Sequence, residues 1–287
     1  MPSLKEYNVK INSLKNTAKV TGTMKMVSTA KFRKAQDAQQ NSRLYADSLN
    51  EAISRLAANA SQGSHPLVQA KSEVNKVLVV LFASDRGLCG GFNNNLFKFV
   101  EKFKADNKDK YSNIDFITCG KRADAHVNKD QTPVKFFDGA TASVQFTTAK
   151  EIGDLAQEAF VSGDYDEVYL CYNIFVSALS QPPTLEKLLP VAPVAGDEAV
   201  EEIDYIYEPG QEELLSYLLP KTVNFKVYSA FLENAAGEHA ARMAAMDAAT
   251  TNAKKLINET TVLRNRARQA AITTELTEIV AGAESLK

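Results

Sequence analysis

Two long stretches without proline, one at each end of the chain, constrain the fold more than any other feature of the sequence. Between Leu4 and Ser64 there is no proline, and Gly22 and Gly63 are the only glycines. Proline and glycine are the residues that a helix interior tolerates least. The first apolar residues recur at steps of three and four, the spacing of one helix face, at Leu4, Tyr7, Ile11, Leu14 and Ala18.

The apolar pattern of this first stretch then changes register and resumes further along. It passes through Val20, Met24 and Val27, and the regular steps return at Ala38, Tyr45, Leu49, Ala52 and Leu56, with Ser42 at one seam position. The sequence predicts one long amphipathic helix, or two helices in line. We expect it to end at His65-Pro66, because the residue before a proline disfavours the helical conformation.

Residues 221–287 form the second stretch, without proline and with only Gly237 and Gly282 as glycines. Its apolar seam has steps of three and four, the spacing of a coiled coil, and consists of Met243, Met246, Ala249, Ala253, Leu256, Thr260, Leu263, Ala267, Ala270 and Thr274. Both stretches adjoin the middle of the chain, so helices that pack along these seams run antiparallel. A seam rich in Ala and Thr is weakly hydrophobic, and such a pair would gain from enclosure by a partner. A compact packing of all parts is the alternative.

The middle of the chain has the pattern of an α/β domain. Apolar runs at 77–83, 114–118, 134–137 and 168–176 predict strands, with helices between them, one reaching about Lys104 and one capped by Thr147 or Thr148 and reaching Val161. Residues 181–207 hold four of the nine prolines and predict an irregular segment. We therefore expect a Rossmann-like α/β base domain at 66–220, between N-terminal (1–65) and C-terminal (221–287) helices that form a long antiparallel coiled coil.

Charge and composition narrow the classes of partner. The net charge is −2, but residues 1–65 carry +6, residues 66–220 carry −10 and residues 221–287 carry +2. A basic arm suits an acidic protein surface or a nucleic acid. Cys89, Cys119 and Cys171 are widely spaced and form no CxxC pair, which predicts buried thiols rather than disulfides or a zinc site. No run is long and apolar enough to span a bilayer, and the first residues have no signal-peptide pattern, so we expect membrane contact only through partners.

The segment SDRGLCGGFN, beginning at Ser84, follows a predicted strand and precedes a predicted helix, where phosphate-binding loops occur. Its glycines, Gly87, Gly90 and Gly91, do not match the GxGxxG pattern. We interpret the segment as a tight turn that needs a positive φ, with Asp85 and Arg86 either paired locally or facing a partner. A nucleotide-dependent α/β enzyme remains the alternative.

Residues suited to catalysis or metal binding are scattered along the sequence. His65, His126 and His239 have no ligand-type neighbours, and Glu238-His239 is followed by Met243 where a zinc-binding helix would need a second histidine. We therefore expect no catalytic residues, metal site or cofactor. The arginines at 264, 266 and 268, with Gln269, spread around a helix because residues two apart point about 200° apart. They suit a solvated surface or contact with acidic groups on several sides. A coiled-coil nucleic-acid binder is a third hypothesis, which the acidic middle segment disfavours.

Four long motifs give the sequence a family resemblance. They are TGTMKMVSTAKFRKAQ from Thr21, SDRGLCGGFN from Ser84, EHAARMAAMDAATTNAKKLI from Glu238 and NRARQAAITTELTEIVAGA from Asn265. In this order and over essentially the whole chain, the sequence resembles the gamma subunits of F-type ATP synthases. It departs from the family pattern at Arg264, where tyrosine is common, and at Gly237, where serine is frequent. It also lacks the inserted cysteine pair of chloroplast members.

The resemblance implies a non-catalytic central-stalk rotor subunit: an antiparallel coiled-coil shaft on an α/β base. Its partners would be three alpha and three beta subunits, an epsilon subunit and a membrane c-ring, with catalysis in beta and proton flow as the driving force. Carried over by position, Arg268 and Gln269 would contact a beta-subunit loop, and Met24 would lie near further beta contacts. Asp85, Arg86 and Gly87 belong to the base signature. The location implied is the cytoplasmic face of a bacterial plasma membrane or, for a processed form, the matrix face of the mitochondrial inner membrane.

Overall fold

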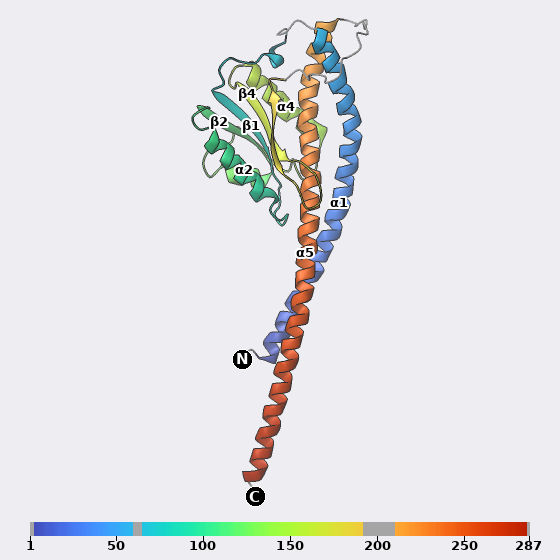
Figure 1. Ribbon diagram of the computed structural model, residues 1–287, viewed down its shortest axis with the longest axis vertical. Helices are drawn as coiled ribbons and strands as arrows, with labels where there is room; N and C mark the ends of the chain where they lie inside the picture. The colour runs from blue at the N-terminus through green and yellow to red at the C-terminus, as the bar shows by residue number, and fades with distance from the viewer. Residues whose placement is uncertain (1–2, 60–64, 192–209, 286–287) are drawn as a thin grey trace. The chain divides into compact units, whose positions relative to one another are not determined.

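The computed structural model describes residues 3–59, 65–191 and 210–285 and has the mixed α/β architecture expected, with long helices at both ends (Figure 1). In chain order its elements are α1 (Leu4–Asn59), η1 (Pro66–Val68), β1 (Lys76–Phe82), α2 (Phe92–Asp106), β2 (Asn113–Cys119), α3 (Lys121–Val127), β3 (Lys135–Phe137), α4 (Phe146–Val161), β4 (Glu167–Asn173), β5 (Pro183–Leu189) and α5 (Gln211–Ser285).

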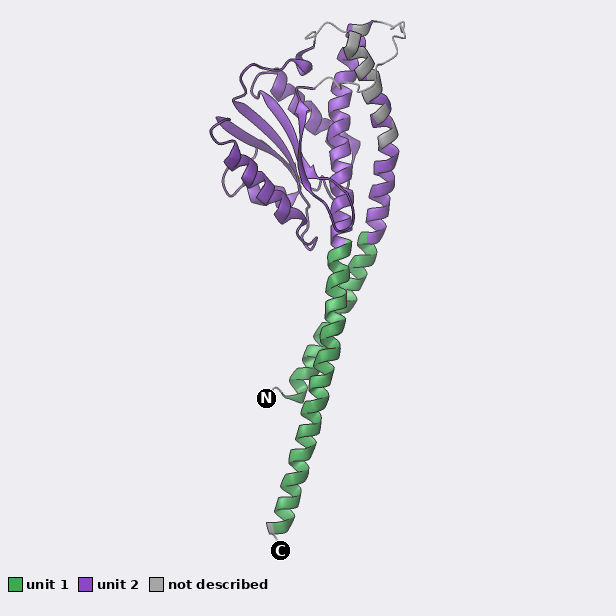
Figure 2. Cartoon of the chain, in the orientation of Figure 1, with its two compact units in different colours: residues 1–28, 243–287 green, residues 29–242 purple. Residues whose placement is uncertain are grey.

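Internal contacts divide the chain into two units (Figure 2). One consists of residues 1–28 and 243–287, the other of residues 29–242, so α1 and α5 each contribute to both. Each unit is described by itself below. The division into 1–65, 66–220 and 221–287 follows the order of the segments along the sequence and stays a prediction.

A five-stranded sheet in the order β3-β2-β1-β4-β5 organises the larger unit. The pairs β1–β2, β1–β4 and β2–β3 are parallel, whereas β4 and β5 are antiparallel. The sheet is therefore largely parallel, as the strands of a Rossmann-like α/β domain are. The expectation that 181–207 is irregular is wrong for Pro183–Leu189, which forms the edge strand β5. Proline is compatible with the first residue of an edge strand, because the missing N–H does not interrupt the ladder. Residues 192–209 lie outside the described residues.

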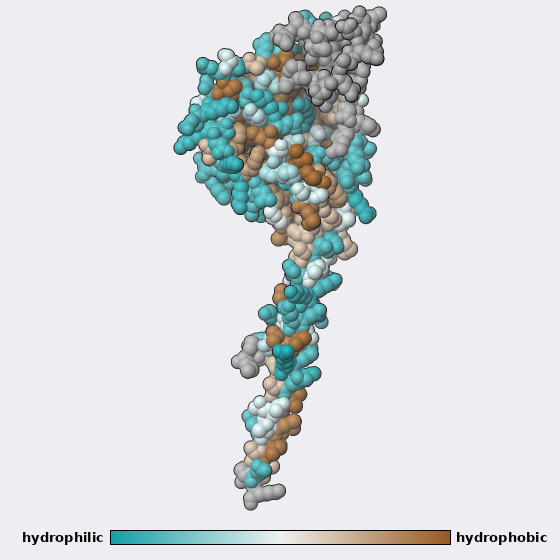
Figure 3. Space-filling view, viewed as in Figure 1, coloured by the Kyte–Doolittle hydropathy of each residue, from teal (hydrophilic) through white to brown (hydrophobic). Residues whose placement is uncertain are grey.

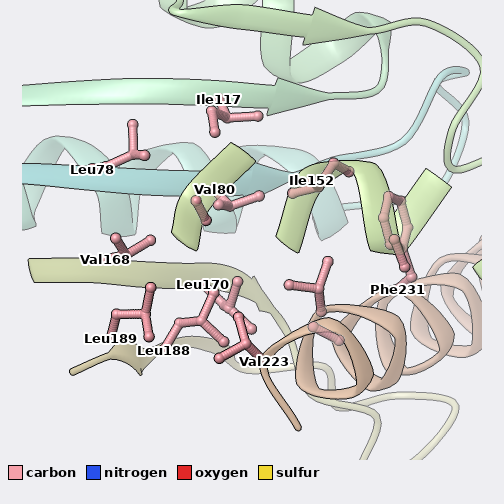
Figure 4. Packing of buried hydrophobic residues seen from close by; sticks show 14 of the residues in the cluster. Leu78, Val80, Ile117, Ile152, Val168, Leu170, Leu188, Leu189, Val223 and Phe231 are labelled. Atoms are coloured by element: carbon pink, nitrogen blue, oxygen red, sulfur yellow. The ribbon is translucent and has the colours of Figure 1, made fainter. Parts of the chain in front are cut away.

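Alternating residues of the central strand β1 belong to two hydrophobic cores, one on each face of the sheet. This is expected for a strand that is buried on both faces. Leu78, Val80 and Phe82 face α4 and α5, whereas Val77, Val79 and Leu81 face α2 and α3. Figure 4 shows the first core between the sheet, α4 and α5; its labelled members are Leu78, Val80, Ile117, Ile152, Val168, Leu170, Leu188, Leu189, Val223 and Phe231.

Helix α5 begins ten residues before the predicted start, and Pro220 lies inside it. A proline in a helix interior is unfavourable by about 3 kcal/mol, which is why the sequence predicts a boundary there. Leu215 and Leu219 are 6 % and 1 % exposed in the core on the sheet, and burial of a leucine side chain contributes about 2 kcal/mol. Tertiary packing therefore outweighs the local signal. At α4 the helix starts at Phe146 after Gln145, and no side-chain hydrogen bond caps it, so the predicted threonine cap is wrong.

In the same unit, α1 packs along α5 and the sheet-bearing segments. Gln39 Nε2 donates to Glu233 Oε1, and the ring pairs Tyr45–Phe225 and Phe32–Phe175 lie 4.7 Å and 5.1 Å apart between centroids. Glu233 also accepts a hydrogen bond from the backbone N–H of Phe175, at 3.0 Å. This carboxylate therefore ties α1, α5 and the segment after β4 together.

In the smaller unit α1 and α5 run antiparallel, as predicted. Arg264 Nη1 donates to Asn8 Oδ1 at 3.4 Å, and Lys25 Nζ donates to Asp247 Oδ1 at 2.7 Å. The step of 17 residues along α1 between these two contacts equals the step back along α5. The two threonine hydroxyls of Thr21 and Thr250, 2.7 Å apart, lie between them. The helices thus keep one register over this span.

The predicted seams are correct only in part. Ile11 is buried, and Leu4, Tyr7, Leu14 and Ala18 are half-buried, as expected, but Val20 and Val27 are 57 % and 52 % exposed. The face of α1 continues through Thr21 and Ser28 without the predicted shift.

The α5 seam differs from the prediction in a similar way. Met246, Ala253 and Thr260 are buried as predicted, whereas Leu256 and Leu263 are 44 % and 48 % exposed. The predicted seam thus departs from the contact face at Leu256 and Leu263, two apolar residues that lie beside that face and not on it.

The last part of α5 extends past the residues that pair with the beginning of α1. From Arg268 to Glu284 every residue is exposed. Apolar side chains lie on the surface of this segment (Figure 3), namely Ile272, Leu276, Ile279 and Val280. Among the described residues no helix has the length and apolar character that crossing a bilayer would need.

Candidate interaction site

The segment between β1 and α2 is an anchored loop, residues 84–91, whose own side chains hold its backbone. Ser84 is buried; its Oγ donates to the carbonyl of Arg86 at 2.6 Å, and its backbone N–H donates to Asn93 Oδ1 at 3.1 Å. Asn93 Nδ2 donates to Ser84 Oγ at 2.7 Å and to Cys89 Sγ at 3.4 Å. Ser84 and Asn93 thus close the loop across its two ends.

The sequence leaves open whether Asp85 pairs locally or faces a partner, and the structure shows local pairing. Asp85 Oδ2 accepts from Thr141 Oγ1 at 2.8 Å, and its Oδ1 accepts from the backbone N–H of Lys121 at 3.1 Å, at the start of α3. Asp85 is therefore engaged locally. The side chain of Arg86 is exposed, and Gly87 is half-buried, with Arg122 Nη2 only 3.2 Å from where a Cβ would lie.

The predicted positive φ is present at Gly90 (φ 61°) and, unexpectedly, at Leu88 (φ 64°). The left-handed conformation disfavours a residue with a Cβ by about 1–2 kcal/mol. Leu88 is also 64 % exposed. Strain of this kind persists where the surroundings fix the backbone and often marks a functional surface. Leu88 therefore belongs with Arg86 as a side chain that the loop presents to solvent.

Arg242 of α5 reaches this loop, and the sequence alone assigns it no role. Arg242 Nη2 lies 3.2 Å from the carbonyl oxygen of Arg86 and 3.3 Å from that of Gly87. The same nitrogen donates to Glu238 Oε1 at 2.7 Å. The signal that could have revealed this pair is the spacing of Glu238 and Arg242, because residues four apart on a helix are neighbours.

Burial perturbs the titration of the α5 residues around this contact. Burial raises the pKa of Glu238, and the nearby Arg242 charge only partly offsets this. Burial, together with the positive charges of Arg242 and Lys31, lowers the pKa of His239 to about 4. At neutral pH His239 is therefore uncharged, and its Nδ1 lies 3.4 Å from Arg242 Nη1.

The other predicted contact residues lie in the smaller unit and do not form one site. Met24 is half-buried on α1, next to Lys25, which pairs with Asp247 of α5. Arg268 and Gln269 are adjacent and exposed on α5. About 20 residues of helix separate these two levels, or roughly 30 Å at 1.5 Å per residue. Arg264, of the predicted arginine cluster, faces Asn8, whereas Arg266 and Arg268 are exposed.

The structure defines a coiled-coil protein with an α/β domain, as shown by the paired terminal helices, the mostly parallel sheet and the anchored loop. Comparisons with known proteins identify the family within this class. A family model described as ATP synthase matches residues 3–286. Proteins named ATP synthase gamma chain from Geobacter sp. (strain M21) and Chlorobaculum parvum are 44% and 43% identical to this chain, each over the full length of both chains. The chain belongs to the ATP synthase gamma chain family.

Solved structures support the fold at lower identity. A chain in the cryo-EM structure of the Euglena gracilis mitochondrial ATP synthase, OSCP/F1/c-ring in rotational state 3, has a TM-score of 0.68 at 20% identity, covering 99% of this chain and 94% of that one. A chain in the central stalk/c-ring structure from Tetrahymena thermophila has a TM-score of 0.60 at 23% identity, covering 80% and 99%. This chain therefore shares its fold with chains of two solved mitochondrial ATP synthase structures.

Proposed function

We propose that this chain is the central-stalk rotor subunit of a proton-translocating F-type ATP synthase and transmits torque between the membrane c-ring and the catalytic alpha/beta hexamer. The observation that carries the proposal is the antiparallel pairing of α1 and α5 together with an exposed continuation of α5. From Arg268 to Glu284 that continuation is exposed and bears apolar residues. A helix surface of this kind gains stability when a partner encloses it. A ring of alpha and beta subunits would provide such an enclosure.

The partners follow from the family to which the chain belongs. We infer three alpha and three beta subunits around the paired helices, and an epsilon subunit and the c-ring at the α/β unit. Arg268 and Gln269 are proposed contacts to beta, because both are exposed on α5. Met24 is a second proposed contact to beta, at a different height along the paired helices. The loop containing Asp85, Arg86 and Gly87 is a proposed contact between the α/β unit and a partner subunit.

The role is non-catalytic and the location is peripheral. ATP chemistry would belong to beta, while this chain changes the state of each beta site as it turns. The similar gamma chains come from bacteria, which favours the cytoplasmic face of the bacterial plasma membrane over the mitochondrial alternative. Membrane contact would occur through the c-ring.

A tagged pull-down from native membranes, with subunit stoichiometry by mass spectrometry, tests the assembly. We expect three alpha, three beta, one epsilon and the c subunits for each copy of this chain. Recovery of the chain alone, or with unrelated proteins, would contradict the proposal. Calorimetry of the isolated chain with ATP or NAD tests the enzyme alternative, for which binding heat is required.

Arg268→Ala tests a single contact. We expect weaker assembly or looser coupling of ATPase to proton pumping, with the isolated chain still folded, because an exposed arginine is not needed for the helix itself. Arg266→Ala is the matched control: Arg266 is also exposed but points about 200° away around the helix. Unchanged complex yield and ATPase rate for Arg268→Ala would refute this contact.

A further inference from the structure

The guanidinium group of Arg242 connects α5 to two consecutive carbonyl groups of the anchored loop. Arg242 Nε and Nη2 lie 3.4 Å and 3.3 Å from the carbonyl oxygen of Gly87, and Nη2 lies 3.2 Å from that of Arg86. The carbonyl of Arg86 also accepts the hydroxyl of Ser84. The peptide groups next to Leu88 are therefore held from the α5 side and from within the loop.

Glu238 fixes the guanidinium group in this position. The two side chains lie one helical turn apart, and their residues are only 5 % and 8 % exposed. An arginine offers several N–H donors in a planar fork, so one group can serve a carboxylate and two carbonyls together, which an ammonium group does not reproduce. The neutral ring of His239 borders the same guanidinium group. Arg242 thus has a defined orientation before any partner binds.

The loop held in this way presents two exposed side chains. Arg86 is exposed, and Leu88 is 64 % exposed with its backbone in the left-handed region. A strained leucine keeps that conformation only while its neighbours are fixed. Asp85 and Asn93 fix the flanks of the loop, whereas Arg242 reaches the two residues immediately before Leu88.

We propose that Arg242, held by Glu238, is a positioning residue that fixes the orientation in which Arg86 and Leu88 meet a partner subunit. Force applied to the loop would then pass directly into α5, without rotation of the loop on its own. The inference rests on the proposed function, in which the loop is a contact surface of a rotor subunit.

The first test measures whether Arg242 holds the loop. Cys89 lies in the loop and is 2 % exposed, while Cys119 and Cys171 in the sheet are 0 % and 1 % exposed. Labelling with iodoacetamide under native conditions, resolved by mass spectrometry, therefore reports opening of the loop and of the sheet separately. For Arg242→Lys in the full chain we expect Cys89 to react about ten- to a hundredfold faster, the effect of losing hydrogen bonds from a charged group. Cys119 and Cys171 should keep their rates.

Two further variants sharpen this test. Glu238→Gln removes the carboxylate charge at similar shape and should also accelerate Cys89. Lys226→Ala removes a surface ion pair with Glu186 elsewhere in the unit and should leave Cys89 unchanged. An unchanged Cys89 rate in Arg242→Lys, or equal acceleration of all three cysteines, would overturn the positioning role, since the second result means general destabilisation.

The functional test is a double-mutant cycle in the reconstituted synthase, with ATP-driven proton pumping per ATP hydrolysed as readout. If Arg242 acts through Arg86, the losses in Arg86→Ala and Arg242→Lys should not add in the double variant. Full additivity would overturn the proposal. Normal coupling in Arg86→Ala, with Cys89 still accelerated by Arg242→Lys, would instead refute the loop as a partner contact, so the two failures are distinguishable.

Discussion

Gly153 marks a point of close approach between α4 and α5, and replacing it by alanine tests how tightly these helices pack. A Cβ at this position would lie 2.0 Å from Asn224 Oδ1, 3.0 Å from its Cγ and 3.1 Å from its Cα. Asn224 cannot rotate away freely. Its Oδ1 accepts from Gln157 Nε2, and its Nδ2 donates to Asp154 Oδ1, both at 2.9 Å.

The magnitude follows from three contributions. Alanine has a higher helix propensity than glycine by about 1 kcal/mol, which favours the variant. Against this stand two hydrogen bonds of Asn224, one of them to a carboxylate, together worth about 2–3 kcal/mol. Overpacking against the Cα of Asn224 adds about 1–3 kcal/mol, because backbone must move. We expect Gly153→Ala to lower the free energy of unfolding of the α/β unit by about 3 kcal/mol.

Urea unfolding of the full chain, monitored through the alkylation rates of Cys119 and Cys171, measures the free energy of unfolding of the α/β unit itself. Both thiols are buried in the sheet and become reactive only when it opens. Gly282→Ala is the control, since nothing lies within 4 Å of its Cβ position; it should not lower the sheet's stability. The double variant with Asn224→Ala should recover part of the loss. A Gly153→Ala protein within about 0.5 kcal/mol of the parent, the range of neutral surface changes, would refute the close packing.

Two further predictions concern charged groups. Burial and the charges of Arg242 and Lys31 lower the pKa of His239 to about 4, so this ring resists protonation in the folded state. The folding stability that depends on the neutral ring at pH 7 is therefore lost as the pH falls from about 6.5 toward 4. Chemical denaturation at several pH values should show the difference between the parent and His239→Gln shifting by about 1–3 kcal/mol over this interval; a pH-independent difference would contradict the assignment. Burial alone would raise the pKa of Asp166, but hydrogen bonds from Lys71 and from the N–H groups of Lys76 and Asn75 lower it to about 2. Asp166→Ala should therefore destabilise the α/β unit by about 1–3 kcal/mol at pH 7. Asp166→Asn, which keeps an acceptor for the two amides, should lose less in the same urea experiment, and equal losses would argue against the role of those amides.

The architecture was predictable where local pattern and tertiary packing agree. The continuous apolar runs of β1 and β4 are buried on both faces of the sheet, so their composition alone predicts strands. The proline-free ends likewise predict helices. Prediction failed at Pro220 and Pro183, where proline is a local stop signal but burial of neighbouring residues in α5 and pairing of β5 with β4 outweigh it.

The candidate site was predictable in position but not in detail. SDRGLCGGFN indicates a special turn, and Gly90 has the positive φ that such a turn needs. The contacts that hold it come from residues far away in sequence, Thr141 and Arg242 among them. No local pattern places these next to the loop. The roles of Met24, Arg268 and Gln269 came from family resemblance and stay predictions.

The adjacent residues Leu256 and Ile257 distinguish the predicted α5 seam, which contains Leu256, from the observed one, which contains Ile257. The sequence favours Leu256, but Leu256 is 44 % exposed, whereas Ile257 is half-buried, at the same steps of three and four as Ala253 and Thr260. Ile257→Ala should therefore weaken the pairing of α1 and α5 by about 1 kcal/mol, part of the value for a fully buried side chain. Leu256→Ala should change it by less than about 0.5 kcal/mol.

Hydrogen exchange of α5 peptides covering residues 243–264 in the isolated full chain distinguishes these outcomes. A loss of 1 kcal/mol corresponds to about fivefold faster exchange. We expect this acceleration for Ile257→Ala and not for Leu256→Ala, because Ile257 is half-buried on the face of Ala253 and Thr260, whereas Leu256 is exposed. The reverse result would mean that the apolar pattern had located the seam correctly and that α5 is rotated about its axis relative to the structure. Since Leu256 faces solvent in the isolated chain, its replacement should have an effect only after assembly, when a partner covers that side of the helix.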